Sequence, residues 1–302
     1  MLPNSCAMQT SEFNMKIKTV LDRLYESRSP HHLANDPLSF CHRYAEPGDR
    51  EAAAIIAAAF AYGGIKIILR TLESIFAVLG PSPRRYVENF SPKQALRDFS
   101  GFKHRFNDGR DLVALLWAVR LMLEDAGSVN SFFLRHHDGA AVDVTSSLNG
   151  YSSAVLGLDF RPVFGCRSAP AGSYFPFLFP APSAGSACKR LCMFLRWVVR
   201  PADGIDLGLW QGISPSRLII PVDTHVARIC GYLGFSARKN ADWRMATEIT
   251  AALRQLDPSD PVRYDFSLAH LGISEGCDGR GGIRCRSCGI AQICPKNVSG
   301  HV

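Results

Sequence analysis

Apolar residues recur at helical spacing along much of the chain. One set follows the positions i, i+3, i+4, i+7 and i+11: Leu112, Leu115, Leu116, Val119 and Leu123. A second set has the same period: Trp243, Ala246, Ile249, Thr250 and Leu253. Such spacing places each set on one face of an α-helix. Alternating patterns typical of strands are scarce, so the pattern predicts a mainly α fold.

Residues typical of helix ends mark three more helices. An apolar run over residues 52–62 follows Asp49 and Glu51 and stops at two glycines, and residues 65–79 continue as a further helix before Gly80. Acidic residues favour helix starts and glycine favours helix ends. Asp260 followed by proline is typical of a helix start, and it predicts a helix that reaches residue 271.

Residues 160–184 break this helical pattern. The segment holds five prolines and a dense set of aromatic residues. Proline at this density excludes a long helix, and the aromatic rings need burial or a partner. We expect an ordered crossing between two helical lobes. The predicted organisation is an N-terminal lobe (residues 1–160), the crossing (161–184), a second lobe (185–275) and a C-terminal loop with a tail (276–302).

Composition indicates a globular protein. The chain has 302 residues, of which 47% are hydrophobic and 20% charged, enough to bury a core. The longest apolar stretch, at eleven residues, is too short to span a bilayer. The first ten residues lack the profile of a signal peptide. We therefore expect a cytoplasmic protein that does not enter a membrane.

The net charge of +7 is unevenly distributed. From residue 185 onward there are 15 Lys and Arg against 10 Asp and Glu, whereas the first 184 residues carry 19 against 17. A basic C-terminal half is compatible with binding to a polyanion such as nucleic acid. Ordinary surface charge explains the same numbers equally well.

Four of the ten cysteines lie within the last 26 residues: Cys277, Cys285, Cys288 and Cys294, with the spacing C-x7-C-x2-C-x5-C. Because we expect a cytoplasmic protein, such crowding is typical of a metal site rather than of disulfides. Structural zinc more often uses two C-x2-C pairs, and a compact loop of four cysteines also suits a [4Fe–4S] cluster. The spacing predicts a metal centre and leaves both metals open.

Lys189 follows a short segment of small residues. Gly185, Ser186 and Ala187 let the backbone approach a ligand closely, and the free N–H groups of a helix that starts here attract phosphate. The helix dipole and the neighbouring Arg190 both disfavour the ammonium form of Lys189. A neutral lysine is a nucleophile for imine chemistry, although most lysines on helix surfaces are simply solvated.

Asp223 precedes an apolar helical stretch in the segment Pro-Val-Asp-Thr-His, which ends at His225. This is the N-cap position, and most aspartates there only cap the helix. A carboxylate held ionised by helix N–H groups is also able to accept a proton or to balance a developing cation.

The order of these three features resembles the helix-hairpin-helix DNA glycosylases, most of all their endonuclease III-like branch. In that superfamily the hairpin reads roughly G-x-G-x-K, the aspartate lies in a P-x-D-[TV]-H-like segment, and a C-terminal C-x6-C-x2-C-x5-C loop binds [4Fe–4S]. The similar segments are residues 50–80 and 183–294. The chain is also similar to a family of uncharacterised bacterial proteins of this length, through residues 185–190 and 206–210.

The resemblance implies two helical lobes with a DNA-binding cleft between them and a base-excision repair glycosylase with AP lyase activity. Lys189 would be the nucleophile and Asp223 its partner, acting on a damaged nucleotide flipped out of double-stranded DNA. The implied DNA contacts are Gly185, Ser186, Ala187, Arg190, His225 and Tyr62. Aromatic residues that would stack on the flipped base are Trp197, Trp210, Phe175 and Phe177.

The four cysteines would hold a structural [4Fe–4S] cluster, and their loop would present Arg284, Arg286 and Lys296 toward the DNA backbone. We expect a monomer associated with the nucleoid.

Three departures from the superfamily pattern leave other functions open. Alanine replaces the second hairpin glycine at position 187, the first cysteine gap is seven residues, and Lys189 and Asp223 are 34 positions apart. The added length lies in residues 201–218; archaeal 8-oxoguanine glycosylases of the same superfamily also have a longer span. The alternatives are a non-catalytic iron–sulfur protein that binds nucleic acid on the same scaffold and a structural zinc protein.

Overall fold

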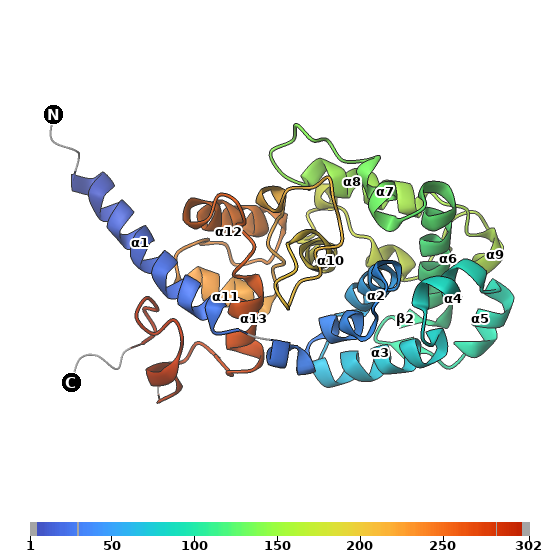
Figure 1. Cartoon of the computed structure of the whole chain (residues 1–302), viewed down its shortest axis with the longest axis horizontal. Coiled ribbons are helices and arrows are strands. Elements are labelled where there is room, and N and C mark those ends of the chain that lie inside the picture. The colour runs from blue at the N-terminus through green and yellow to red at the C-terminus, as the bar shows by residue number, and fades with distance from the viewer. Residues whose placement is uncertain (1–4, 29, 282, 298–302) are drawn as a thin grey trace.

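The computed structural model describes residues 5–28, 30–281 and 283–297, and most of this chain is helical (Figure 1). The α-helices are α1 (Ser5–Glu26), α2 (Pro47–Phe60), α3 (Ile65–Leu79), α4 (Pro83–Asn89), α5 (Pro92–Asp98), α6 (Gly109–Ala126), α7 (Val129–Leu134), α8 (Thr145–Leu156), α9 (Arg161–Phe164), α10 (Lys189–Val199), α11 (Thr224–Tyr232), α12 (Trp243–Leu256) and α13 (Asp265–Ile273). Within the described ranges the only strands are the two-residue β1 (Lys103–His104) and β2 (Asn107–Asp108), which pair antiparallel. The predicted mainly α fold is confirmed.

Short 3-10 helices connect these elements. They are η1 (Pro30–Asn35), η2 (Pro37–Arg43), η3 (Phe175–Leu178), η4 (Pro182–Ala184), η5 (Pro215–Arg217) and η6 (Ile283–Ser287).

The apolar stripes lie on helices, as their periods predict. All five residues of the first stripe are buried in α6, and all five of the second are buried in α12. The helix expected over residues 65–79 is α3, with these same bounds and Gly80 as its C-cap at a positive φ of 70°. Spacing and end signals are therefore sufficient to locate these helices.

One predicted helix start is wrong. Residues 261–264 form a turn, and α13 begins only at Asp265. The side chain of Asp260 does not cap a helix, because its Oδ2 accepts a hydrogen bond from Arg200 Nε at 2.8 Å. The Asp260 carboxylate, which the local pattern assigns to helix capping, instead binds Arg200 of a distant segment.

Helices α2 and α10 lie in the middle of the molecule. Figure 1 shows α4, α5, α6 and α9 on one side of them and α1, α11, α12 and α13 on the other. Helix α1 packs against α12 and α13, so the beginning of the described chain lies beside its last helices. Buried hydrophobic side chains form one continuous core through both sides.

The proline-rich segment 160–184 folds into short helices, α9, η3 and η4, against this core. Phe160, Phe175 and Phe179 are buried, as their size demands. Tyr174 and Phe177 are exposed. The segment thus buries only part of its aromatic surface.

Residues 201–218 pack at the end of α10. The backbone N–H groups of Leu207 and Trp210 donate to the carbonyls of Trp197 and Val198, each at 2.7 Å, and so satisfy carbonyls of the last turn of α10. The Trp210 Nε1–H also donates to buried Glu51 of α2 at 2.7 Å. The segment therefore stabilises the helix that begins with Lys189.

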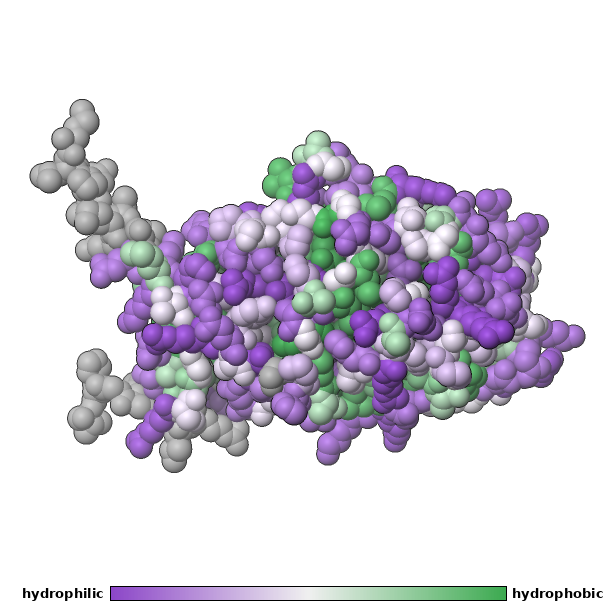
Figure 2. Space-filling view, in the orientation of Figure 1, coloured by the Kyte–Doolittle hydropathy of each residue, from purple (hydrophilic) through white to green (hydrophobic). Residues whose placement is uncertain are grey.

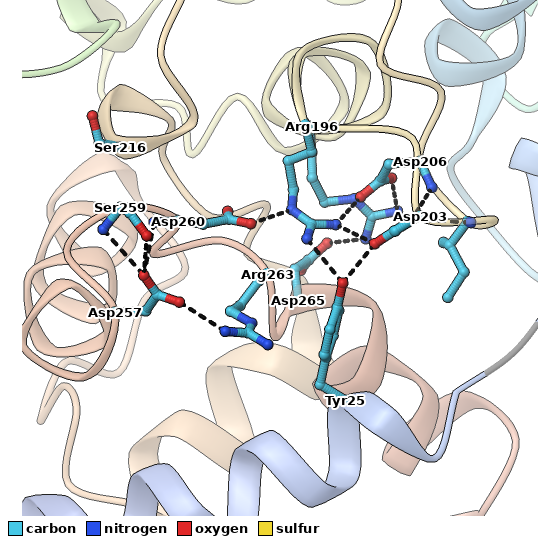
Figure 3. Close-up of polar contacts among 12 residues, drawn as sticks. Tyr25, Arg196, Asp203, Asp206, Ser216, Asp257, Ser259, Asp260, Arg263 and Asp265 are labelled. Carbon is cyan, nitrogen blue, oxygen red and sulfur yellow. Dashed lines mark hydrogen bonds and ion pairs between the residues drawn. The ribbon is translucent and has the colours of Figure 1, made fainter.

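A network of buried ion pairs holds the C-terminal half of α10 in place (Figure 3). Arg196 pairs with Asp206 at 3.1 Å and with Asp265 at 2.6 Å, and Arg200 pairs with Asp206 and Asp260. The side chain of Asp206 is fully buried. Buried charges are tolerated only when they are paired, and these pairs join α10 to the segment 201–218 and to α13.

The surface is largely hydrophilic on the face that Figure 2 shows, with hydrophobic atoms visible mainly in the middle of the view. Among the helices that the structure describes, none combines the length and the apolar character needed to cross a membrane.

Candidate functional site

Lys189 is the first residue of α10, as predicted. Gly185 has a φ of +78° and Cys188, the N-cap residue, a φ of +47°, so the chain turns sharply before the helix starts. Ser186 forms an isolated bridge with Asp242, the N-cap residue of α12. Contact with α12 therefore holds the turn that places Lys189 at the helix N-terminus.

Asp223 is the N-cap of α11, also as predicted. Its Oδ1 accepts hydrogen bonds from the N–H groups of His225 and Val226, both at 2.8 Å. Its other oxygen, Oδ2, lies 4.0 Å from Lys189 Nζ. Helix capping thus fixes one carboxylate oxygen and leaves the second to face the lysine, across 34 positions of sequence.

Lys189 and Asp223 lie in a cavity of about 610 Å³. Their side chains are 32% and 21% exposed, so both are accessible to a ligand without being free in solvent. The cavity walls come from the α2–α3 connection and from α10, α11 and α13. Among the lining residues are Tyr62, Gly63, Met193, Trp197, His225 and Phe266.

Asp265 and Arg196 also line this cavity, and sequence reasoning missed both. The pKa of Asp265 is raised to about 6, because burial and the nearby Asp223 raise it by more than Arg196 and Lys189 lower it. Arg196 Nη1 donates to Asp265 Oδ2 at 2.6 Å. No local pattern distinguishes Asp265 from any other acid in a first helical turn, because its role depends on α10.

His225 lies in the cavity against the backbone of α13. A Cβ on Gly272 would lie 2.1 Å from His225 Nδ1, so only glycine leaves room for the ring. Arg228 Nη2 lies 3.2 Å from the same nitrogen and donates to the carbonyl of Cys277. Helix α11 therefore connects the lysine–aspartate cavity to the cysteine segment.

The four clustered cysteines line a second cavity, of about 710 Å³, beside the C-terminal end of α11. All four are free thiols. Burial raises the pKa of Cys285 and of Cys288, and the neighbouring Cys277 and Cys294 raise both further. Among the described residues, no three Cys, His, Asp or Glu side chains converge on a point that would suit a single metal ion.

Arg190 and Tyr62 are placed differently from the predicted DNA contacts. Arg190 is buried, and its guanidinium donates to the carbonyls of Ala59 and Phe177. Burial lowers its pKa to about 10. The Tyr62 hydroxyl donates to the His104 carbonyl at 2.9 Å. The Arg190 guanidinium is therefore engaged within the protein rather than free for a phosphate, whereas Tyr62 also lines the lysine–aspartate cavity.

The remaining predicted residues occupy varied positions. Gly185 is exposed, and Ser186 and Ala187 are half-buried at the start of α10. Trp197 lines the cavity from a buried position, whereas Phe175 and Trp210 lie in the core. Arg286 and Lys296 are exposed, and the side chain of Arg284 lies outside the described residues.

Comparison with curated proteins gives no match, and comparison with solved structures gives none either. One family model, described as "Protein of unknown function (DUF2400)", matches residues 36–274. The match includes Lys189, Asp223 and Asp265 and ends before the first clustered cysteine. Because it spans more than half of the 302 residues, the chain belongs to the DUF2400 family.

Proposed function

We propose that this protein is a DNA glycosylase with AP lyase activity, built as two helical lobes on either side of a helix-hairpin-helix site. The observation that carries the proposal is the approach of Lys189 Nζ to within 4.0 Å of Asp223 Oδ2 inside a cavity. An amine beside a fixed carboxylate is the pair that imine-forming nucleophilic catalysis requires. The cavity of about 610 Å³ is large enough for one flipped nucleotide.

The reaction follows from this pair. Asp223 accepts a proton from the Lys189 ammonium, and the neutral Nζ attacks C1′ of the flipped nucleotide. The glycosidic bond breaks and the base leaves with its electron pair. Opening of the C1′–O4′ bond gives an imine between Nζ and C1′. Loss of a proton from C2′ then expels the 3′ phosphate, and water releases the lysine.

The cysteine segment would hold a [4Fe–4S] cluster, with zinc as the alternative. Cys277, Cys285, Cys288 and Cys294 line one cavity of about 710 Å³, and four thiolates within a compact loop suit such a cluster. A bound cluster would be structural. Arg228 would hold the segment to α11 through the Cys277 carbonyl.

The expected partner is double-stranded DNA with a damaged base, bound by a monomer in the nucleoid. The N-termini of α10 and α11 both face the cavity, and helix N-termini bind phosphate. Arg286 and Lys296 of the cysteine segment are exposed and would contact the DNA backbone. Lys296 lies at the end of α11, with its Nζ 5.4 Å from the centroid of the Tyr232 ring.

Borohydride trapping tests the proposal. Purified protein would be incubated with duplex oligonucleotides that carry an abasic site, uracil, 8-oxoguanine or an oxidised pyrimidine. We expect a covalent adduct with at least one substrate. The Lys189→Gln variant should form none, and Asp223→Asn should form it at least 100-fold more slowly. Lys239→Gln is the matched control, because Lys239 is an exposed lysine away from the cavity.

An adduct that survives Lys189→Gln would move the nucleophile to another amine. If metal-loaded protein forms no adduct and releases no base with any of these substrates, the proposed lyase activity is contradicted. Salt-dependent DNA binding in that protein would then favour the non-catalytic alternative.

A further inference from the structure

Three exposed aromatic rings touch one another outside the cavity. Phe106, Tyr174 and Phe177, which we call the aromatic patch, are 48%, 47% and 42% exposed. The ring centroids of Phe106 and Tyr174 are 5.3 Å apart in a stacked arrangement, and those of Phe106 and Phe177 are 6.3 Å apart edge to face. Single exposed apolar residues are ordinary, but a contiguous group marks an interaction site.

The patch is held in place by buried polar contacts. Phe106 lies at the tip of the β1–β2 hairpin, beside Arg105, whose φ is +52°. Asn107, next to it, is fully buried and donates to the Tyr174 carbonyl at 3.0 Å. The hairpin and the segment 160–184 are thus locked together beneath the rings. The rings are therefore exposed on a surface whose backbone is held in place by these contacts.

Two exposed cations lie beside the patch. The guanidinium of Arg105 lies 5.5 Å from the centroid of the Phe106 ring, and Lys103 is exposed on the same hairpin. In the part of the chain that the structure describes, neither cation forms an ion pair. The nearest acid in sequence, Asp108, accepts hydrogen bonds from the N–H groups that begin α6. Basic groups beside exposed rings favour nucleic acid.

The patch adjoins the lysine–aspartate cavity. Phe177 contacts Tyr62, with ring centroids 5.2 Å apart, and Tyr62 lines the cavity. A Cβ on Gly63, another lining residue, would lie 3.1 Å from Arg105 Cδ, so Arg105 rests on the cavity rim. A strand that leaves the cavity would therefore meet the patch directly.

We propose that the aromatic patch stacks on unpaired nucleotides next to the flipped nucleotide, so that the protein prefers DNA with a single-stranded stretch at this position. The inference rests on the proposed function, which brings DNA to the cavity. One intercalating side chain would need only one ring. Three adjoining rings offer room for more than one base, and stacking on aromatic rings is tolerant of sequence.

Fluorescence anisotropy tests this substrate preference without catalysis. The probes would be a fully paired duplex with a tetrahydrofuran abasic analogue, the same duplex with three unpaired nucleotides beside the analogue, and an oligo-dT strand. We expect tighter binding to the second and third probes than to the first. Phe106→Ala and Tyr174→Ala should each weaken binding to them about tenfold, with a much smaller effect on the paired duplex. Phe13→Ala is the matched control, because Phe13 is 54% exposed on α1.

Phe106→Trp separates stacking from structural damage, since a larger ring should keep or strengthen binding to the unpaired probes. Equal losses on all three probes would overturn the single-strand preference and indicate a contact with the duplex. Unchanged binding accompanied by altered self-association in sedimentation would overturn it in favour of a contact between copies. If the patch variants lose binding to the unpaired probes and the wild type forms no borohydride adduct, the role of the patch is supported while the lyase is contradicted.

Discussion

At the scale of single residues, the cavity combines carboxyl groups in different environments. Asp223 is 21% exposed and capped by helix N–H groups, whereas Asp265 is nearly buried and paired with Arg196. Burial opposes the charged form of a carboxyl group. The two acids of one site therefore differ in how far the protein shields them from water.

Asp265 should make stability depend on pH. Its pKa in the folded chain is raised to about 6, above the value near 4 of a free carboxyl. Between these values the folded chain holds a proton that the unfolded chain has released, so a rise in pH favours unfolding. We expect this group to remove about 2 kcal/mol of stability as the pH rises from 4 to 7.

Urea denaturation at pH 4.5 and pH 7 would measure this effect. The unfolding free energy of the wild type, relative to that of Asp265→Asn, should be higher at pH 4.5 than at pH 7. The opposite trend would show that the Arg196 pair dominates the burial of Asp265.

Gly272 should be irreplaceable in α13. Gly272→Ala places a methyl group 2.1 Å from His225 Nδ1, so the ring must move and the unfolding free energy should fall by about 1–3 kcal/mol. Gly231→Ala in α11 is the control, because its Cβ meets only an ordinary contact at 3.9 Å. The control should be neutral or stabilising by about 0.5–1 kcal/mol. Thermal melts distinguish the two variants, and an equal effect of both would contradict the close packing.

At the scale of elements, α10 depends on residues far away in the sequence. Carbonyls of its last turn accept hydrogen bonds from residues 207 and 210. Arg196 and the C-cap residue Arg200 pair with acids of the segment 201–218 and of residues 260–265. The segment that lengthens the span from Lys189 to Asp223 is thus structural support, and it leaves the pair within 4.0 Å.

Trp210→Phe should weaken this support. The variant keeps an aromatic ring but removes the donor to Glu51 Oε1, a buried carboxylate oxygen. We expect the unfolding free energy to fall by about 1–3 kcal/mol, because the buried Glu51 carboxylate loses one of its hydrogen-bond donors. Trp117→Phe is the comparison. Its Nε1 donates to the Asp159 carbonyl at a half-buried site, where water replaces the lost bond, so denaturation should show a smaller effect.

Sequence predicts these elements where the signal is local. The period of α6 and α12, the bounds of α3, and the capping role of Asp223 all follow from neighbours within one or two turns. The burial of Arg190 does not, because its contacts with Ala59 and Tyr62 join residues more than 100 positions apart. The late start of α13 fails for the same reason, since Arg200 engages Asp260.

At the scale of the whole molecule, α1 at the beginning of the described chain packs beside the elements at its end. Tyr264 donates to Asp22 at 2.6 Å, and Arg28 pairs with Glu275 at 2.6 Å. A Cβ on Gly289 would lie 2.6 Å from Leu24 Cδ1, so the cysteine segment rests directly on α1. Loss of order in that segment should therefore loosen α1.

Cys288→Ser tests this coupling together with the metal. We expect the variant to bind less iron, and limited proteolysis should cut α1 and the cysteine segment faster than in wild type while the central helices resist. Cys166→Ser is the control, because Cys166 is an exposed cysteine outside the cluster. Unchanged metal content in Cys288→Ser would exclude the proposed centre.

The docking of α1 also sets an order of events during synthesis. Its partners at residues 264 and 289 are translated more than 200 positions later. The apolar face of α1, with Ile17, Leu21 and Leu24, must wait uncovered while the ribosome makes nearly the whole chain. A stalled or shortened chain would therefore expose this face to chaperones and proteases.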